Sequence, residues 1–164
     1  MVLWDKKGGE KGEKAELEFK KWLDKNKINH LYIKQDLKSF PKSFENTLRR
    51  PDFIIMLENI GMIMVEVRRR SIYPRYNTIP IDTEDLKKYI RFQSKFNIPI
   101  WYAVSNEQLN YKTWFWIPMS KIAELETPML HSSKSKQNFI PISLDKFSRI
   151  EYNEHIGKIF SKNF

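Results

Sequence analysis

Cysteine is absent from this chain of 164 residues. Its absence excludes disulfide bonds, zinc sites built on thiolates, iron–sulfur clusters and a cysteine nucleophile. A chain without cysteine fits a reducing compartment, and we expect a cytoplasmic protein. Histidine is scarce as well: His30, His131 and His155 are isolated in the sequence and lack the spacing of metal ligands.

Long apolar segments are also missing. The longest candidate, from Phe53 to Val67, is interrupted by acidic residues and a glycine, whereas a membrane helix needs about 20 predominantly apolar residues. The first residues lack the apolar core of a signal peptide. The sequence therefore predicts no membrane partner.

What the chain does contain favours one folded domain. Hydrophobic residues make up 41% of the chain and aromatic residues 14%, and domains commonly have about 100–200 residues. Lysine and arginine total 29 against 20 acidic residues, which gives a formal net charge of +9. A basic excess of this size suits a polyanion partner, with nucleic acid first.

Hydropathy patterns predict alternating helices and strands. Helices are expected over 12–25, 83–96 (with Thr83 as its N-cap) and 120–125. Strands are expected over 28–37, 52–57, 62–68, 98–104, 114–117 and 139–144, with the tryptophans of the later strands in the core. Residues 1–10 are predicted to be a mobile start, and 38–50, 69–83 and 126–138 to be irregular, while the segment beyond Asp145 has no clear pattern. Helices between strands indicate an α/β fold with a single mixed β-sheet flanked by helices.

Two acidic residues flank the predicted hairpin of residues 52–68. Antiparallel pairing would bring Asp52, at the start of the first strand, to Glu66, near the end of the second. Glu66 shares a strand face with Arg68. A buried carboxylate needs a partner, and a pair of carboxylates suits Mg²⁺ or Mn²⁺. Structural ion pairing of Glu66 with Arg68 or Arg69, with Asp52 capping a turn, explains the same residues equally well.

These residues resemble the signature of the PD-(D/E)xK nuclease superfamily, whose restriction-endonuclease-like fold is then expected here. The matching segments are Pro51-Asp52 and Glu66-Val67-Arg68, each on an apolar strand. Upstream, Lys11-Gly12 followed by Glu16 is similar to the start of archaeal Holliday-junction resolvases. The resemblance covers about residues 10–125. It implies one nuclease-like domain over 1–164, with about 126–164 as a C-terminal extension.

The resemblance implies a mechanism and its residues. Glu16, Asp52 and Glu66, with the backbone carbonyl of Val67, would hold Mg²⁺ or Mn²⁺, and Arg68 would complete the catalytic set. The family normally has lysine where this chain has Arg68. Arginine stays protonated and cannot act as a general base, although it can clamp a phosphate. A lysine from elsewhere, such as Lys34 or Lys87, would be one replacement.

Basic and aromatic residues surround the acidic motif in the sequence and are candidates for contacts with phosphates and unpaired bases. They are Arg49, Arg50, Arg69, Arg70, Tyr73, Arg75 and Tyr76. The predicted function is metal-dependent hydrolysis of DNA, with branched or junction DNA and a homodimer suggested by the resolvase resemblance. Two alternatives stay open: a nucleic-acid-binding protein impaired in catalysis by Arg68, and an accessory subunit of a nucleic-acid-processing complex.

Overall fold

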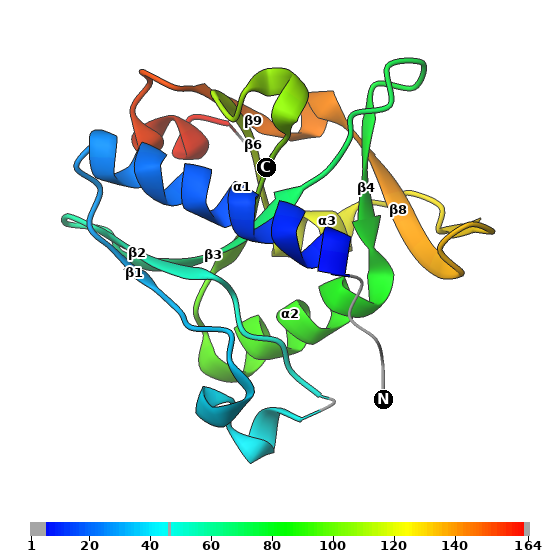
Figure 1. The fold of residues 1–164 in the computed structure, drawn as a ribbon, viewed down its shortest axis with the longest axis horizontal. Coiled ribbons are helices and arrows are strands. Elements are labelled where there is room, and N and C mark those ends of the chain that lie inside the picture. Colours follow the sequence, from blue (N-terminus) through cyan, green and yellow to red (C-terminus); the bar gives the residue numbers. More distant parts are fainter. Residues whose placement is uncertain (1–5, 46, 163–164) are drawn as a thin grey trace.

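The computed structural model describes residues 6–45 and 47–162. A six-stranded sheet of order β1-β2-β3-β5-β6-β9 forms the centre of the fold (Figure 1). Only β3 and β5 run parallel, and the remaining neighbours in this sheet are antiparallel. The strands are β1 His30–Tyr32, β2 Phe53–Leu57, β3 Gly61–Arg69, β5 Ile100–Ser105, β6 Thr113–Pro118 and β9 Ser148–Glu151. The predicted mixed sheet with flanking helices is confirmed.

Helices cover both faces of this sheet. α1 (Lys6–Lys25) lies across one face, and α2 (Thr83–Phe96) and α3 (Met119–Glu124) pack on the other. The side chains of β3 alternate between the two cores, because Ile63 and Val65 belong to the α1 side and Met64 to the α2 side.

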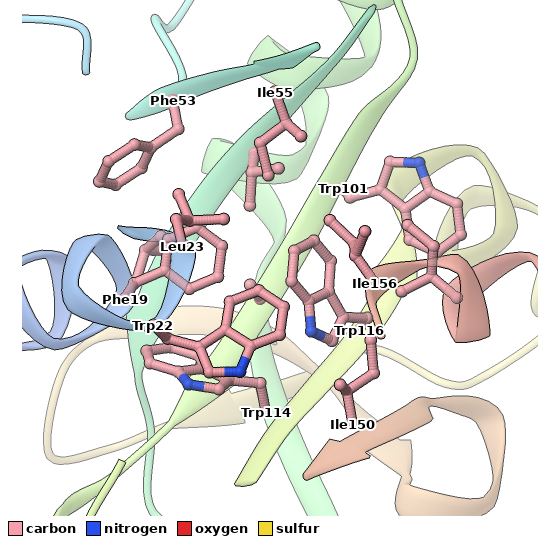
Figure 2. Close-up of a cluster of buried hydrophobic side chains, with 14 of the residues drawn as sticks. Phe19, Trp22, Leu23, Phe53, Ile55, Trp101, Trp114, Trp116, Ile150 and Ile156 are labelled. Atoms are coloured by element: carbon pink, nitrogen blue, oxygen red, sulfur yellow. The ribbon is translucent and has the colours of Figure 1, made fainter. Parts of the chain in front are cut away.

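The core on the α1 side is rich in aromatic side chains (Figure 2). Phe19 of α1 meets Phe53 of β2 and Trp114 of β6 edge-on, with ring centroids 5.2 and 4.9 Å apart. Trp101 and Trp116 are buried in the same cluster, as predicted for the tryptophans of these strands. This packing fixes α1 on the sheet, since each aromatic side chain removes a large apolar area from water.

A second, three-stranded sheet of order β4-β8-β7 was not predicted. Its strands are β4 Thr78–Asp82, β7 Leu130–Ser132 and β8 Gln137–Ser143. The prediction that 69–83 and 126–138 are irregular throughout is therefore wrong, because these segments contain β4 and β7. Pro80 is accommodated because β4 is an edge strand, where a residue without an N–H group is tolerated.

Several other element bounds differ from the predictions. α1 begins at Lys6, so residues 6–10 are helical, whereas residues 1–5 of the expected mobile start lie outside the described residues. β1 is much shorter than the strand expected over 28–37, because the chain leaves the sheet after Ile33, whose N–H donates to the carbonyl of Asp52 (2.7 Å). The segment beyond Asp145 adds β9 and a short 3-10 helix over Ile156–Phe160.

The N-cap of α2 is Asp82 rather than Thr83. The Asp82 carboxylate accepts a hydrogen bond from the N–H of Asp85 (2.9 Å), which satisfies one of the free N–H groups at the helix start. Thr83 Oγ1 instead donates to the carbonyl of Asn138 in β8 (3.2 Å). This junction places the first turn of α2 beside the end of β3. None of the described helices has the length and hydropathy of a membrane-spanning helix.

Candidate active site

The β2–β3 hairpin sets Asp52 and Glu66 side by side. The turn between the strands ends at Gly61, whose φ of +125° is open to glycine, and the register pairs Phe53 with Val65. The N–H of Asp52 donates to the carbonyl of Val65 (3.0 Å), and the N–H of Val67 donates to Asp52 Oδ2 (2.8 Å). Both acids are buried, with 5% of Asp52 and 2% of Glu66 exposed. Two carboxylates therefore lie inside the protein at the same end of the hairpin.

Glu16 of α1 is a third carboxylate, and its charge acts on Asp52. Burial and the neighbouring Glu66 and Glu16 carboxylates raise the pKa of Asp52 well above its ordinary value. Burial likewise raises the pKa of Glu16, and Glu66 adds to this shift. The hydroxyl of Tyr32 donates to Glu16 Oε2 (2.8 Å), which partly stabilises the charged form of Glu16. The three acids repel one another, and a cation among them would relieve this repulsion.

Arg68 lies between the acid pair and α2. Its Nη2 atom is 2.6 Å from Glu66 Oε1 and 3.2 Å from Asp85 Oδ2. Asp85 also forms an ion pair with Arg49. One carboxylate of α2 thus holds two guanidinium groups beside Glu66.

The other carboxylate oxygen of Glu66 is unpartnered. Glu66 Oε2 is buried and has no hydrogen-bond partner within the described residues. An unsatisfied buried carboxylate oxygen is costly, and such atoms commonly mark a place for an ion or a water. Glu66 is therefore neutralised on one side only.

The donor set fits a hard divalent cation. Asp52 and Glu66 supply carboxylate oxygens, which Mg²⁺ and Mn²⁺ prefer, and Glu66 Oε2 is free to bind. Within the parts of the chain that the structure describes, no three His, Cys, Asp or Glu side chains converge into a complete metal cluster. Glu16 is close enough to affect Asp52 electrostatically, but Tyr32 engages one of its oxygens.

The basic residues predicted to bind nucleic acid divide into three groups. The charge of Arg68 acts to lower the pKa of both Arg49 and Arg70, which indicates that these two arginines lie near Arg68. Arg50 and Arg69 are engaged locally: the Arg50 guanidinium lies 5.1 Å from the centre of the Phe40 ring and donates to the carbonyl of Ser39 (2.8 Å), while Arg69 pairs with Glu107 (2.9 Å). The third group, Tyr73, Arg75 and Tyr76, occupies an exposed turn in which the guanidinium of Arg75 lies over the Tyr76 ring (5.6 Å).

Lys34 and Lys87, considered as substitutes for the motif lysine, are exposed. Lys87 pairs with Glu84 at the surface (2.9 Å), so its ammonium group already has an acidic partner. On the face of β3 that carries Glu66, Met62 is 56% exposed, whereas Met64 is buried. The strand extends beyond the core at Met62, which lies next to the turn.

Sequence reasoning missed Asp85 and Tyr32 as members of the site. Asp85 lies in the first turn of α2, where an acidic residue suits the helix dipole. Its contact with Arg68 depends on how α2 packs against β3, which no local pattern encodes. Tyr32 lies on the short edge strand β1, and its hydroxyl reaches Glu16 across the gap to α1.

No protein-family model matches the chain, and no curated protein matches it. Solved structures do. The Holliday junction resolvase Hjc of the archaeal hyperthermophile Archaeoglobus fulgidus is similar with a TM-score of 0.54 at 14% sequence identity, over 94% of this chain and 98% of the resolvase. A bacterial homing endonuclease (TM-score 0.45, 13% identity, 81% and 72% covered) and a nuclease from a fusselovirus (0.43, 13%, 80% and 77%) are more distant. The chain thus has a nuclease-like, restriction-endonuclease-like fold.

Proposed function

We propose that this protein is a divalent-metal-dependent endonuclease of the PD-(D/E)xK superfamily that hydrolyses DNA phosphodiester bonds. The observation that carries the proposal is the buried pair of Asp52 and Glu66 at the end of one hairpin, with Glu66 Oε2 unpartnered. The nuclease-like fold and the net charge of +9 support it. A role in stability alone accounts poorly for two neighbouring buried carboxylates, because each would need a cationic partner to offset the free-energy cost of its burial.

Asp52, Glu66, Glu16 and the backbone carbonyl of Val67 would hold Mg²⁺ or Mn²⁺. When bound, such an ion polarises the scissile phosphate and lowers the pKa of a water that becomes the nucleophile. The chain supplies the position of its ligands: the Val67 N–H fixes the Asp52 carboxylate, and Tyr32 orients Glu16.

Arg68 would act on the phosphate rather than on a proton. The guanidinium stays protonated and offers two parallel N–H donors, which match phosphate oxygens. Its contact with Asp85 holds it at the site even if a cation replaces it at Glu66. Arg68 would thus bind the scissile phosphate and stabilise the charge that develops in the transition state.

Branched or junction DNA is the substrate class that we propose to test first. The likeness to a structure of a Holliday junction resolvase supports this choice. Two nicks across a junction require two active sites, so we propose a homodimer. The nucleic-acid surface would comprise Arg49, Arg50, Arg69, Arg70, Tyr73, Arg75 and Tyr76.

A catalytically impaired DNA-binding protein is the second candidate, and one observation favours it. Arg68 Nη2 lies 2.6 Å from Glu66 Oε1, so a positive charge already neutralises one of the proposed metal ligands. In this case the fold and the basic residues would serve binding while the ion pair replaced the metal.

Incubation with labelled junction, flapped, duplex and single-stranded DNA in Mg²⁺ or Mn²⁺ tests the proposal. We expect cleavage that falls by at least about 100-fold in Asp52→Asn and Glu66→Gln. Glu58→Gln, in the turn of the same hairpin, is the matched control and should leave the rate unchanged. Binding of DNA without cleavage in either metal would overturn the nuclease proposal and favour the impaired binder.

A further inference from the structure

A pocket of about 200 Å³ lies where the segment after β3 meets the second sheet. Its lining includes Arg70 and Tyr73, which follow β3, and Ser135, Gln137 and Phe139, which lie on and next to β8. Arg70 follows directly after β3, two residues beyond Arg68 in the chain. The pocket therefore adjoins the candidate active site without being part of it.

Arg70 brings to this pocket a positive charge that no ion pair engages within the described residues. Its Nη1 atom donates a long hydrogen bond to the carbonyl of Arg69 (3.4 Å). Burial and the charge of Arg68 lower the pKa of Arg70. A guanidinium remains protonated nonetheless, so an anion at this position would relieve an unfavourable arrangement.

The pocket also contains an acidic residue. Asp82 lines the pocket, and its Oδ1 atom accepts the hydrogen bond from the Asp85 N–H that caps α2. Arg70 feels the charge of Asp82 but makes no ion pair with it. Asp82 keeps its negative charge and offsets part of the charge of Arg70, while the Arg70 guanidinium is the cationic group that the pocket offers to a ligand.

The aromatic lining suits a flat ring. Half of Tyr73 is exposed, and its backbone is held by a hydrogen bond to the carbonyl of Thr78 (3.2 Å) and by one from the N–H of Asn77 (2.8 Å). A ring on a fixed backbone offers a stacking surface at a low cost in conformational entropy. Ser135 and Gln137 add hydroxyl and amide groups that can pair with the edge of a base.

Size limits what the pocket can receive. About 200 Å³ is below the roughly 300–1,000 Å³ typical of complete small-molecule sites. One nucleotide of a strand fits this description better than a free metabolite. A base within a duplex cannot enter, because its faces are stacked and its edge is paired.

We infer that this pocket binds one unpaired nucleotide of the DNA substrate, with the phosphate on Arg70 and the base against Tyr73 and Phe139. The inference rests on the proposed function for the identity of the polymer. It adds that the second sheet recognises single-stranded character next to the cleavage site, as occurs at junctions, flaps and frayed ends.

Fluorescence anisotropy with a labelled oligothymidylate and with a blunt duplex, in EDTA, tests this inference. We expect Arg70→Gln to weaken binding of the single strand by about ten-fold or more and to leave duplex binding within about two-fold. The slope of log affinity against log salt should also decrease by about one for the single strand. Free thymidine monophosphate should compete poorly, because the flanking phosphates of a strand contribute to binding.

Two controls distinguish a binding loss at the pocket from a general loss of positive charge and from misfolding. Arg91→Gln removes an equal charge from the exposed face of α2 and should affect both DNAs slightly and equally. Tyr73 is exposed, so Tyr73→Ala should fold and lose single-strand binding, whereas Tyr73→Phe should retain it. Equal losses in Arg70→Gln and Arg91→Gln, or no difference between the two Tyr73 variants, would overturn the inference.

The outcome is independent of cleavage because the assay contains no divalent cation. A selective loss in Arg70→Gln with no cleavage of any DNA would support the pocket and reject the nuclease proposal. Cleavage that depends on Asp52, combined with unselective binding losses, would reject the pocket and support the nuclease proposal.

Discussion

Arg68 is held by carboxylates from two different elements, Glu66 of β3 and Asp85 of α2. Burial opposes the charged form of Arg68, but Glu66 together with Tyr89, Tyr102 and Asp52 outweighs burial and raises the pKa of Arg68 well above its ordinary value. The guanidinium is therefore a permanent cation at every pH at which the protein folds. A lysine at the same position would be a single ammonium group on a more flexible stem, with a pKa that can adjust.

Replacing Arg68 with lysine tests how this cation affects turnover. A lysine ammonium is a single point charge and cannot bridge Glu66 and Asp85 in the way a guanidinium fork does. We expect Arg68→Lys to increase the cleavage rate by about ten-fold, because lysine keeps a positive charge for the phosphate and leaves Glu66 freer to bind the metal. Single-turnover cleavage across a range of Mn²⁺ concentrations measures this, with Arg91→Lys as the control. A fall in rate to that of Arg68→Ala would show instead that the guanidinium itself is required.

Asp52 gives a prediction about pH and stability. Its pKa in the folded state is raised above the ordinary value of 3.8, so the folded protein binds the Asp52 proton more tightly than the unfolded chain does. Stability from this group therefore falls as pH rises from about 3.8 through the raised pKa. We expect Asp52→Asn to be more stable than the parent protein at neutral pH in EDTA, with an advantage that grows as pH increases. Urea unfolding at several pH values measures it.

A cation should reverse the effect of Asp52. Mg²⁺ or Mn²⁺ at about 100 times its dissociation constant would stabilise the parent protein by about 2.7 kcal/mol and leave the stability of Asp52→Asn unchanged.

For the pH prediction, Asp24 serves as a control of opposite sign, because its hydrogen bond with Lys20 lowers the pKa of Asp24. Asp24→Asn should therefore be destabilising above the ordinary pKa of aspartate. An Asp52→Asn protein that was less stable at all pH values would contradict the buried repulsion described above.

At the residue scale, the sequence predicted those features that follow from local pairing. Asp52 and Glu66 meet because an antiparallel hairpin with a short turn leaves few registers open. The ion pair between Arg68 and Glu66 was one of two readings of their shared strand face, and it is present together with an unpartnered Glu66 oxygen. Asp85 was out of reach, because its contact with Arg68 depends on the position of α2 relative to a strand earlier in the chain.

At the scale of elements, α1 carries Glu16 and is held by aromatic packing one turn further along. Phe19 is fully buried against Phe53 and Trp114. Glu16 and Phe19 are three residues apart and therefore lie on neighbouring positions of the helix surface. The position of the third carboxylate thus depends on this aromatic contact.

Truncation of Phe19 should destabilise the protein and loosen Glu16 together. We expect Phe19→Ala to cost about 3–5 kcal/mol of unfolding free energy, because it leaves a cavity among rings that cannot collapse into it. Leu17→Ala, on the exposed side of the same helix (53% exposed), should change stability by less than about 0.5 kcal/mol. Chemical denaturation measures both. A small effect of Phe19→Ala would mean that α1 is held by contacts other than the ring cluster.

Elements whose stability comes from distant partners escaped prediction. β7 has three residues and pairs with β8, and β4 contains Pro80 and pairs with a segment about 60 residues later in the chain. β7 is too short to show an alternating pattern, and β4 alternates over five residues but contains a proline, which argues against a strand. α2 was predicted over its full length because its amphipathic pattern and its acidic first turn are local features.

At the scale of the whole molecule, the C-terminal residues complete both cores. β9 pairs with β6 and places Ile150 in the α1-side cluster, which also contains Ile156 and Ile159. Ile142 and Phe147 belong to the cluster on the α2 side. The region expected as an extension of a core over about 10–125 therefore contributes buried side chains to each face of the sheet.

Removal of the region after Leu125 gives the last prediction. A chain ending at Leu125 would lack β7, β8 and β9, and β6 and β4 would be left without these partners. It would also lack the buried side chains of Ile142, Phe147, Ile150, Ile156 and Ile159. Full burial of one such side chain is worth about 1.5–3 kcal/mol, so the combined loss is comparable to the roughly 5–15 kcal/mol that stabilises a typical domain. We expect the truncated chain to show no cooperative thermal transition, by circular dichroism or calorimetry.

A graded control distinguishes loss of the core from damage by truncation itself. In the full chain, Ile150→Ala should cost about 2–5 kcal/mol and still unfold cooperatively, while Ile60→Ala, at a position 68% exposed, should be nearly neutral. If the chain ending at Leu125 unfolded cooperatively and bound DNA, the second sheet would be a separable module, and its pocket at Arg70 would be an addition to a self-sufficient fold. If it did not, the sheet that lines this pocket is part of the structure that holds Asp52 and Glu66 in place, and recognition and the acidic site share one folding unit.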